Sequence, residues 1–205
     1  MKNLEKVADK IEEELSQKDK VREKALKSSR AVVRMSGTLL QGLYSGHKNA
    51  SDLDELEKEV SSLSNLLAEN PELSFTGYVE TALQEYSELG IIMRILEKDD
   101  VPTPEELNVP SVAYLLGLGD SVGELRRLCL EELKAGKTER ADHFLKLMEM
   151  ISAVLMRFDF PEAIVPIRRK QDVARSLIEK TRGDVAVATS ARRLQEKLEE
   201  VLRKG

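Results

Sequence analysis

The sequence predicts an all-α protein in which seven helices, several of them long, form a bundle. Charged residues make up 34% of the 205-residue chain and hydrophobic residues 41%. The hydrophobic residues recur at intervals of three or four, which is the spacing of amphipathic helices and not of strands. A chain of this length can bury one substantial core, so we expect residues 1–205 to form a single domain.

The first three predicted helices are bounded by polar segments and prolines. Residues 1–45 form one long helical pattern, which the segment YSGHKNASD ends. A second helix contains the apolar residues from Leu53 to Leu67 and ends at ENP, and a third runs from Pro71 to about Lys98. The segment KDDVPTPEELNVP then breaks the pattern with three prolines. We interpret it as a surface connection and not as a domain boundary.

Four further helices are predicted in the second half of the chain. One spans residues 112–133 and ends near Ala135–Gly136, and the next runs from Thr138 to about Leu155. After FDFPEAIVP come a basic helix, RRKQDVARSLIEKTR, and a final helix, ARRLQEKLEEVLRKG. No strand pair and no solenoid repeat is predicted. Helices this long leave apolar surface that a second copy can cover, so we expect a homo-oligomer.

Composition narrows the class of protein. A formal net charge of −5 argues against a uniformly basic surface that coats nucleic acid, while a local basic face remains compatible with it. The single cysteine, Cys129, allows no internal disulfide or thiolate zinc cluster, and its apolar surroundings favour a core position over a nucleophile. The sequence contains no signal peptide and no membrane-spanning run, so we expect a cytoplasmic protein with no membrane partner.

The predicted helix at residues 112–133 contains two acids where apolar residues are expected. Asp120 and Glu124 lie one turn apart on one face, and the same row continues to Leu116 and Leu128. A carboxylate within an apolar row costs free energy unless a cation or hydrogen-bond donors compensate it. The two acids are therefore candidate functional residues.

The third predicted helix repeats this feature with Glu85 and Glu88. These acids lie in a row with Tyr78, Thr81, Ile92 and Ile95, of which only Thr81 is neither apolar nor aromatic. Carboxylate oxygens are the ligands that Mg²⁺ prefers, and Mg²⁺ held by such a cluster can activate water against a phosphodiester. A solvated helix face gives the same spacing of acids, so the pattern alone leaves both interpretations open.

Basic residues gather in two places. In the first helix Lys27, Arg30 and Arg34 follow one face. The sixth predicted helix contains a second group, Arg168, Arg169, Lys170 and Arg175. Either group is typical of a solvated face that offsets the acids elsewhere, or of a groove that binds a polyanion backbone without sequence preference.

Other motifs carry less information. Glu139 and His143 are four residues apart, which is not the Glu-x-x-His step of carboxylate-bridged di-iron bundles. His47 lies in a predicted loop, and two histidines make no site. The segment GLGDSVG lacks the lysine and the preceding strand of a phosphate-binding loop.

Four segments of the chain resemble translin and translin-associated factor X. They are REKALKSSRAVVRMSGTLLQGLYSG, LQEYSEL, YLLGLGDSVGELRRLCLEELKAG and RRKQDVARSLIEKTRGDVA, in the same order as in that family. The tract GDSVGELRR resembles the family's Asp-x-x-Gly-Glu-Leu-x-Arg signature. The tract QEYSE resembles the Gln-Glu-Tyr-x-Glu of the factor X branch, and the compact chain resembles an archaeal single-subunit version.

The resemblance implies a fold, a site and an assembly. It implies a translin-like bundle that assembles into a hollow shell, an octamer in this family, with its active acids facing the interior. The factor X branch binds magnesium and cleaves RNA, and its catalytic, metal-binding acids correspond to Glu85, Glu88, Asp120 and Glu124. The translin branch binds nucleic acid but lacks the complete acid set.

These expectations combine into one leading hypothesis and two alternatives. The leading hypothesis is a Mg²⁺-dependent endoribonuclease, with Mn²⁺ as a substitute ion, that cleaves single-stranded RNA inside a homo-oligomeric shell. Lys27, Arg30 and Arg34 would hold the RNA backbone, and single-stranded DNA is a further possible ligand. The alternatives are a non-catalytic, translin-like scaffold that binds single-stranded RNA or DNA, and a helical protein–protein adaptor.

Overall fold

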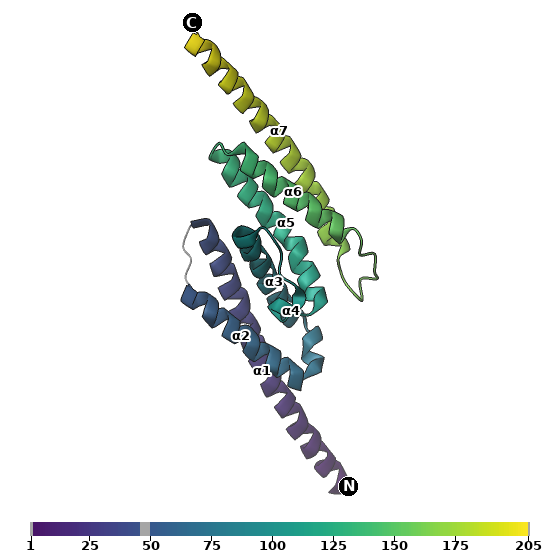
Figure 1. Ribbon diagram of the computed structural model, residues 1–205. Coiled ribbons are helices and arrows are strands. Elements are labelled where there is room, and N and C mark those ends of the chain that lie inside the picture. Colours follow the sequence, from purple (N-terminus) through teal and green to yellow (C-terminus); the bar gives the residue numbers. More distant parts are fainter. Residues whose placement is uncertain (1, 46–49, 205) are drawn as a thin grey trace. The chain divides into compact units, whose positions relative to one another are not determined.

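The computed structural model describes residues 2–45 and 50–204, and within them it contains helices joined by loops and no strand (Figure 1). The all-α class and the number of seven α-helices are as predicted. Residues 46–49, which include His47 and the middle of the predicted break after the first helix, lie outside the described residues. The elements are α1 (Lys2–Ser45), α2 (Ala50–Glu69), the 3-10 helix η1 (Pro71–Phe75), α3 (Gly77–Lys98), α4 (Pro104–Leu107), α5 (Ser111–Lys134), α6 (Thr138–Leu155) and α7 (Arg168–Lys204).

The prediction of two separate C-terminal helices is wrong. The two segments form one helix, α7, that continues through the segment GDVAVATS. A glycine inside a helix costs about 1 kcal/mol, which is too little to break a helix whose neighbouring residues favour it. Buried Val185 lies two residues after Gly183 and holds this stretch against its unit.

The seventh helix is instead found within the proline-rich connection. Pro104 occupies the first turn of α4, where a missing N–H is tolerated. The hydroxyl of Thr103 accepts a hydrogen bond from the backbone N–H of Glu106, and the Glu106 carboxylate accepts one from the backbone N–H of Thr103. This capping box makes a one-turn helix out of a segment that we expected to be irregular.

The chain divides into two compact units, Met1–Leu89 and Gly90–Gly205, and the division falls inside α3. Unit 1 contains α1, α2, η1 and the first part of α3. Unit 2 contains the rest of α3 and the helices α4 to α7. The expectation of a single domain over residues 1–205 stays a prediction, and the two units are described in turn.

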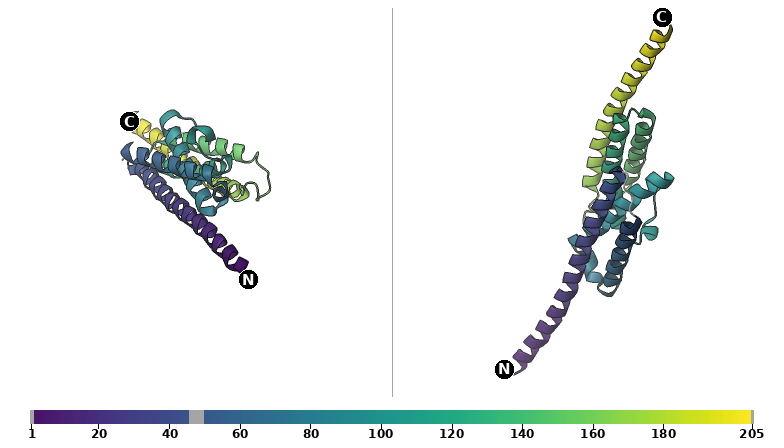
Figure 2. Two further views of the ribbon diagram at one scale, coloured as in Figure 1. Left: turned by 90° about the horizontal axis from the view of Figure 1, so that it is seen from below. Right: turned by 90° about the vertical axis from the view of Figure 1, so that its left-hand side faces the viewer.

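Unit 1 is built on the antiparallel pair of α1 and α2, which lie side by side in Figures 1 and 2. The hydroxyl of Ser28 on α1 donates a hydrogen bond to Glu59 on α2, at 2.7 Å. One face of α2 is buried through an apolar row at intervals of four and three, comprising Leu56, Val60, Leu63 and Leu67. The buried row of α1 consists of smaller residues, Ala25, Ser29, Val32 and Ser36, which allow close packing of neighbouring helices.

Unit 2 is organised around α5, which is buried on more than one side by α6 and α7 (Figure 1). α6 returns antiparallel to α5 after a turn in which Gly136 adopts a φ of 71°, a conformation that favours glycine. The side chain of Gln171 donates hydrogen bonds to the carbonyls of Leu155 and Phe158, at 2.8 and 2.9 Å. These bonds fix the start of α7 to the end of α6.

Two helical segments expose apolar rows to solvent. The first half of α1 exposes Leu4, Val7, Ile11 and Leu15, and the end of α7 exposes Leu194, Leu198, Val201 and Leu202. Rows of this kind favour association with another surface. None of the helices in the described part of the chain is long and apolar enough to cross a membrane.

We expect Ile11→Glu to weaken self-association without lowering the free energy of unfolding of the individual chain. The side chain is 50% exposed, so a charge in its place meets water in the free chain and an apolar partner in an oligomer. Light scattering coupled to gel filtration measures the mass of parent and variant at equal concentration. Glu13→Gln, on the opposite side of α1, is the matched control. A monomeric parent, or an unchanged mass for Ile11→Glu, contradicts this prediction.

Candidate functional site

The four acids singled out in the sequence lie within apolar rows of the folded chain. Glu85 and Glu88 on α3, and Asp120 and Glu124 on α5, are all half-buried. On α3 the residues between and beside the acids, Tyr86, Ser87 and Leu89, are buried. On α5 the row that contains the acids begins at the buried Leu116 and ends at the half-buried Leu128. The acids therefore differ from those of a fully solvated helix face.

The acids are distributed over both units. Glu85 and Glu88 belong to unit 1, and Asp120 and Glu124 belong to unit 2. Within each unit, no three His, Cys, Asp or Glu side chains among the described residues gather closely enough to hold a metal ion. A single site formed by all four acids stays a prediction.

Both acids on α5 have a cation beside them. The ammonium group of Lys170, in the first turn of α7, donates a hydrogen bond to Oδ1 of Asp120. One guanidinium nitrogen of Arg127 lies 4.0 Å from Oε2 of Glu124, one turn along α5. The side chains of Asp120 and Lys170 are only 28% and 24% exposed, so this ion pair is better shielded from water than a typical surface pair.

Of two glycines on α5, Gly119 and Gly123, only Gly119 is needed for the close approach of α7 to the acids. A Cβ atom at Gly119 would lie 2.8 Å from Cβ of Lys170, nearer than two carbon atoms can pack, whereas one at Gly123 would lie 4.0 Å from Cδ1 of Leu177. Further along, Arg126 donates hydrogen bonds to Thr181 at 2.5 Å and to Asp184 at 2.9 Å. α7 therefore runs parallel to α5, and of the two glycine positions it lies closer at Gly119, the residue before Asp120.

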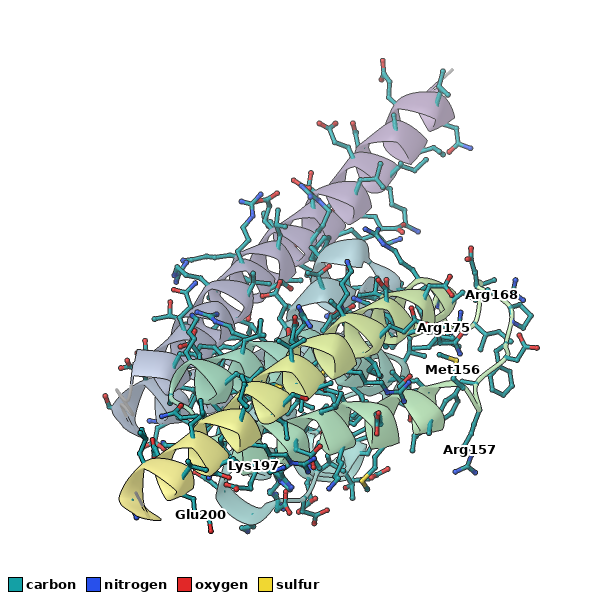
Figure 3. All side chains as sticks on the ribbon, turned by 90° about the horizontal axis from the view of Figure 1, so that it is seen from above. Met156, Arg157, Arg168, Arg175, Lys197 and Glu200 are labelled. Carbon is teal, nitrogen blue, oxygen red and sulfur yellow. The ribbon has the colours of Figure 1, made fainter. Side chains whose placement is uncertain are left out.

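Two other basic residues near the start of α7, Arg168 and Arg175, pair with acids outside the candidate site. Arg168 lies 3.5 Å from Asp159, and Arg175 lies 3.3 Å from Asp172 and 3.8 Å from the sulfur of Met156. Figure 3 shows Arg168 and Arg175 beside the segment that joins α6 to α7. Arg168, Arg169, Lys170 and Arg175 are one basic group in the sequence, but in the structure Lys170 differs from Arg168 and Arg175 because it reaches Asp120. No spacing signal within α7 distinguishes this lysine.

The basic row of α1 is exposed on unit 1. Lys27, Arg30 and Arg34 are all exposed, and none has an acid within ion-pair distance among the described residues. By contrast, Arg22 on the same helix pairs with Asp19 at 3.0 Å and with Glu23 at 2.5 Å. Lys27 also lines a groove of about 490 Å³ between α1 and α2, together with Lys24, Ser28, Ala31, Glu59, Ser62, Asn65, Leu66 and Glu69.

Cys129 and His143 have structural surroundings. Cys129 is fully buried, and its thiol donates a hydrogen bond to the carbonyl of Ala141, at 3.3 Å. Burial raises the pKa of Cys129 to about 11, so the nucleophilic thiolate is scarce near neutral pH. Nε2 of His143 lies 2.8 Å from Asp99 on the surface of unit 2. The interpretation of Cys129 as a core residue is confirmed.

The chemistry of the acids on α5 fits a hard divalent cation. Mg²⁺ is usually bound through one or two carboxylates and keeps several of its waters, which it can exchange for substrate phosphate oxygens. Asp120 and Glu124 supply two carboxylates from one face, and the Lys170 ammonium already lies against Asp120 where positive charge is favoured. The residues present therefore fit Mg²⁺.

The fold and these surfaces define an all-α protein with paired, half-buried carboxylates and a separate exposed basic row. The chain belongs to the translin family, whose family model matches residues 1–182. An uncharacterised protein of Methanocaldococcus jannaschii is 36% identical over 194 residues, which cover 91% of this chain and 85% of that protein.

Solved structures show the same fold. The crystal structure of apo-NeC3PO has a TM-score of 0.78 at 23% identity and covers 88% of this chain and 96% of that chain. The structure of an AfC3PO–duplex RNA complex has a TM-score of 0.73 at 29% identity and covers 90% of this chain and 97% of that chain. The expected translin-like fold is therefore confirmed.

We expect Gly119→Ala to lower the free energy of unfolding by about 1–3 kcal/mol. The added methyl group would meet the stem of Lys170 close to its backbone, where neither helix can yield easily. Urea denaturation followed by circular dichroism measures the loss.

Gly123→Ala is the matched control on the same face of α5. Its methyl group would make only ordinary contact with Leu177, and alanine favours the helix by about 1 kcal/mol over glycine. We therefore expect Gly123→Ala to be neutral or stabilising. Equal effects of the two substitutions would show that α7 does not pack tightly on Gly119.

Proposed function

We propose that this protein is a Mg²⁺-dependent endoribonuclease of the translin type. The observation that supports this proposal best is the half-burial of Glu85, Glu88, Asp120 and Glu124 within apolar rows of a translin-family chain. Each position corresponds to a catalytic acid in the factor X branch that the sequence resembles. A protein that only bound nucleic acid would gain nothing from withdrawing acids from water.

In this proposal the acids hold the metal and orient the water that attacks RNA. Mg²⁺, when bound, would polarise the phosphodiester and lower the pKa of water. The carboxylates of Asp120 and Glu124 would act from one face of α5, and those of Glu85 and Glu88 from one face of α3. The packed leucines beside the acids would keep the carboxylates in fixed positions.

The basic row of α1 would bind the RNA backbone. Lys27, Arg30 and Arg34 are exposed and form no ion pair among the residues described, so their charge is available to phosphates. The related AfC3PO structure is a complex with duplex RNA, which makes RNA the preferred polyanion. Single-stranded RNA remains the proposed substrate, and a duplex belongs in the same assay as a second ligand.

The proposal includes self-assembly. The exposed apolar rows of α1 and α7 provide surface that further copies of the chain can cover. A homo-octameric shell, as the family resemblance implies, would enclose the acids and admit RNA to its interior.

We expect Asp120→Asn and Glu85→Gln each to reduce Mg²⁺-dependent RNA cleavage by at least about 100-fold. Each substitution keeps the shape of the side chain but removes the negative charge that a cation needs. Labelled single-stranded RNA incubated with Mg²⁺ or with a chelator measures the rate. Glu131→Gln, which changes an exposed acid on the far end of α5, is the matched control. Cleavage by either site variant at the parent rate contradicts the assignment.

A non-catalytic scaffold is the second candidate, and the same assay separates it from the nuclease. The duplex RNA complex of a relative supports binding, and it says nothing about cleavage by this chain. RNA binding by the parent without any metal-dependent product would favour the scaffold. The absence of RNA binding at low salt would leave only the protein–protein adaptor.

We expect the double substitution of Arg30→Gln and Arg34→Gln to weaken RNA binding and its salt dependence. Each lost contact between a cation and a phosphate should reduce the slope of log affinity against log salt by about 0.7 for a single strand. Fluorescence anisotropy in chelator measures binding apart from cleavage. Arg22→Gln is the control, since that arginine is already neutralised by Asp19 and Glu23. Equal losses for the control and the double variant would contradict the assignment.

A further inference from the structure

The proposed function gives no role to Lys170 of unit 2. This lysine lies in the first turn of α7, and its ammonium group donates a hydrogen bond to Oδ1 of Asp120. Its neighbours Arg168 and Arg175 pair with acids outside the candidate site, so the contact does not reflect a general attraction between the basic end of α7 and α5.

The packing of the two helices holds this lysine in place. The stem of Lys170 fills the space that a side chain at Gly119 would need, because its Cβ lies 2.8 Å from that position. Because the stem of Lys170 lies on Gly119, its ammonium group reaches the carboxylate of the next residue, Asp120. Gln171, the next residue of α7, is fixed by hydrogen bonds to the carbonyls of Leu155 and Phe158. Lys170 is thus anchored on both sides and does not meet Asp120 by chance.

The contact places a protein cation where a metal ion would bind. A carboxylate oxygen that accepts a hydrogen bond from an ammonium group cannot bind Mg²⁺ at full strength, because the two positive charges repel each other at short range. The pair is about three-quarters withdrawn from water, with exposures of 28% for Asp120 and 24% for Lys170, so solvent weakens this competition only in part.

We propose that Lys170 is a built-in counter-ion that occupies the cation position on Asp120 in the metal-free protein and competes with the divalent ion. Its ammonium group balances the negative charge of the half-buried Asp120 when no metal is bound. A metal ion that binds there either displaces the ammonium group or is repelled by it. Lys170 thereby lowers the affinity of the site for Mg²⁺. This inference rests on the proposed function, because it takes Asp120 to be a metal ligand.

The test measures metal binding by the full chain without RNA, so that catalysis plays no part. Mn²⁺ is the probe, since it suits the same oxygen ligands and its paramagnetic resonance signal falls on binding. We expect Lys170→Met to bind Mn²⁺ about tenfold more tightly than the parent, because the stem over Gly119 is kept while the competing charge is lost. Lys170→Arg, which keeps a cation there, should bind no more tightly than the parent.

Lys180→Met is the matched control on the same helix. Lys180 is exposed, and it lies ten residues from Lys170, which corresponds to about 15 Å along α7. Its substitution removes the same net charge from the chain and should leave Mn²⁺ binding unchanged. An equal gain in Lys180→Met would attribute the effect to net charge and overturn the proposal.

A second measurement guards against loss of stability in the variant. For each protein the melting temperature is measured with and without Mg²⁺, and the difference is compared between proteins. A lower stability of the metal-free variant therefore does not affect the comparison. We expect a larger increase for Lys170→Met than for the parent, and we expect Asp120→Asn in the same chain to abolish it.

The outcomes separate the two proposals. If the parent binds Mn²⁺ through Asp120 and Lys170→Met binds it no more tightly, Lys170 only anchors α7, and the inference is wrong while the proposed function stands. If neither protein binds Mn²⁺ in an Asp120-dependent way, the metal site and the inference are both wrong. Tighter binding that appears in Lys170→Met alone and disappears with Asp120→Asn supports the inference.

Discussion

The close approach of α7 to α5 at Gly119 is the contact on which the polar chemistry of unit 2 depends. Because residue 119 has no side chain, the stem of Lys170 lies directly on α5 and its ammonium reaches Asp120. Arg126, with its hydrogen bonds to Thr181 and Asp184, fixes the same two helices further along. One tight helix–helix contact thus decides both the packing and the charge balance around the acid.

Charge compensation explains why acids are tolerated within the apolar rows. A half-buried carboxylate costs free energy that a nearby cation offsets. On α5 the chain supplies such cations itself, Lys170 beside Asp120 and Arg127 beside Glu124. Acids compensated in this way can lie half-buried within the fold, because the chain's own cations balance their charge.

Unit 1 uses two sides of one helix for different purposes. The buried row of α1, Ala25, Ser29, Val32 and Ser36, consists of small residues that let neighbouring helices approach. Lys27, Arg30 and Arg34 lie on the opposite side of the helix and are exposed. A substitution on the basic side can therefore change the charge of this surface while the packing of the helix is kept. The first half of α1 exposes an apolar row, which is the surface available to further copies of the chain.

The sequence by itself determined the helical class, most helix boundaries and the rows in which the acids lie, because these features depend on local spacing and on residues that start or stop helices. The half-burial of those rows was decided by the tertiary structure. Prediction from the sequence failed where tertiary packing outweighs local preference: α7 continues through Gly183, and a capping box turns the proline-rich segment into α4. Only the tertiary structure identified Lys170 as the partner of Asp120. Those residues are 50 positions apart, and their contact depends on a glycine in one helix facing a lysine stem in another, which no spacing within either helix reveals.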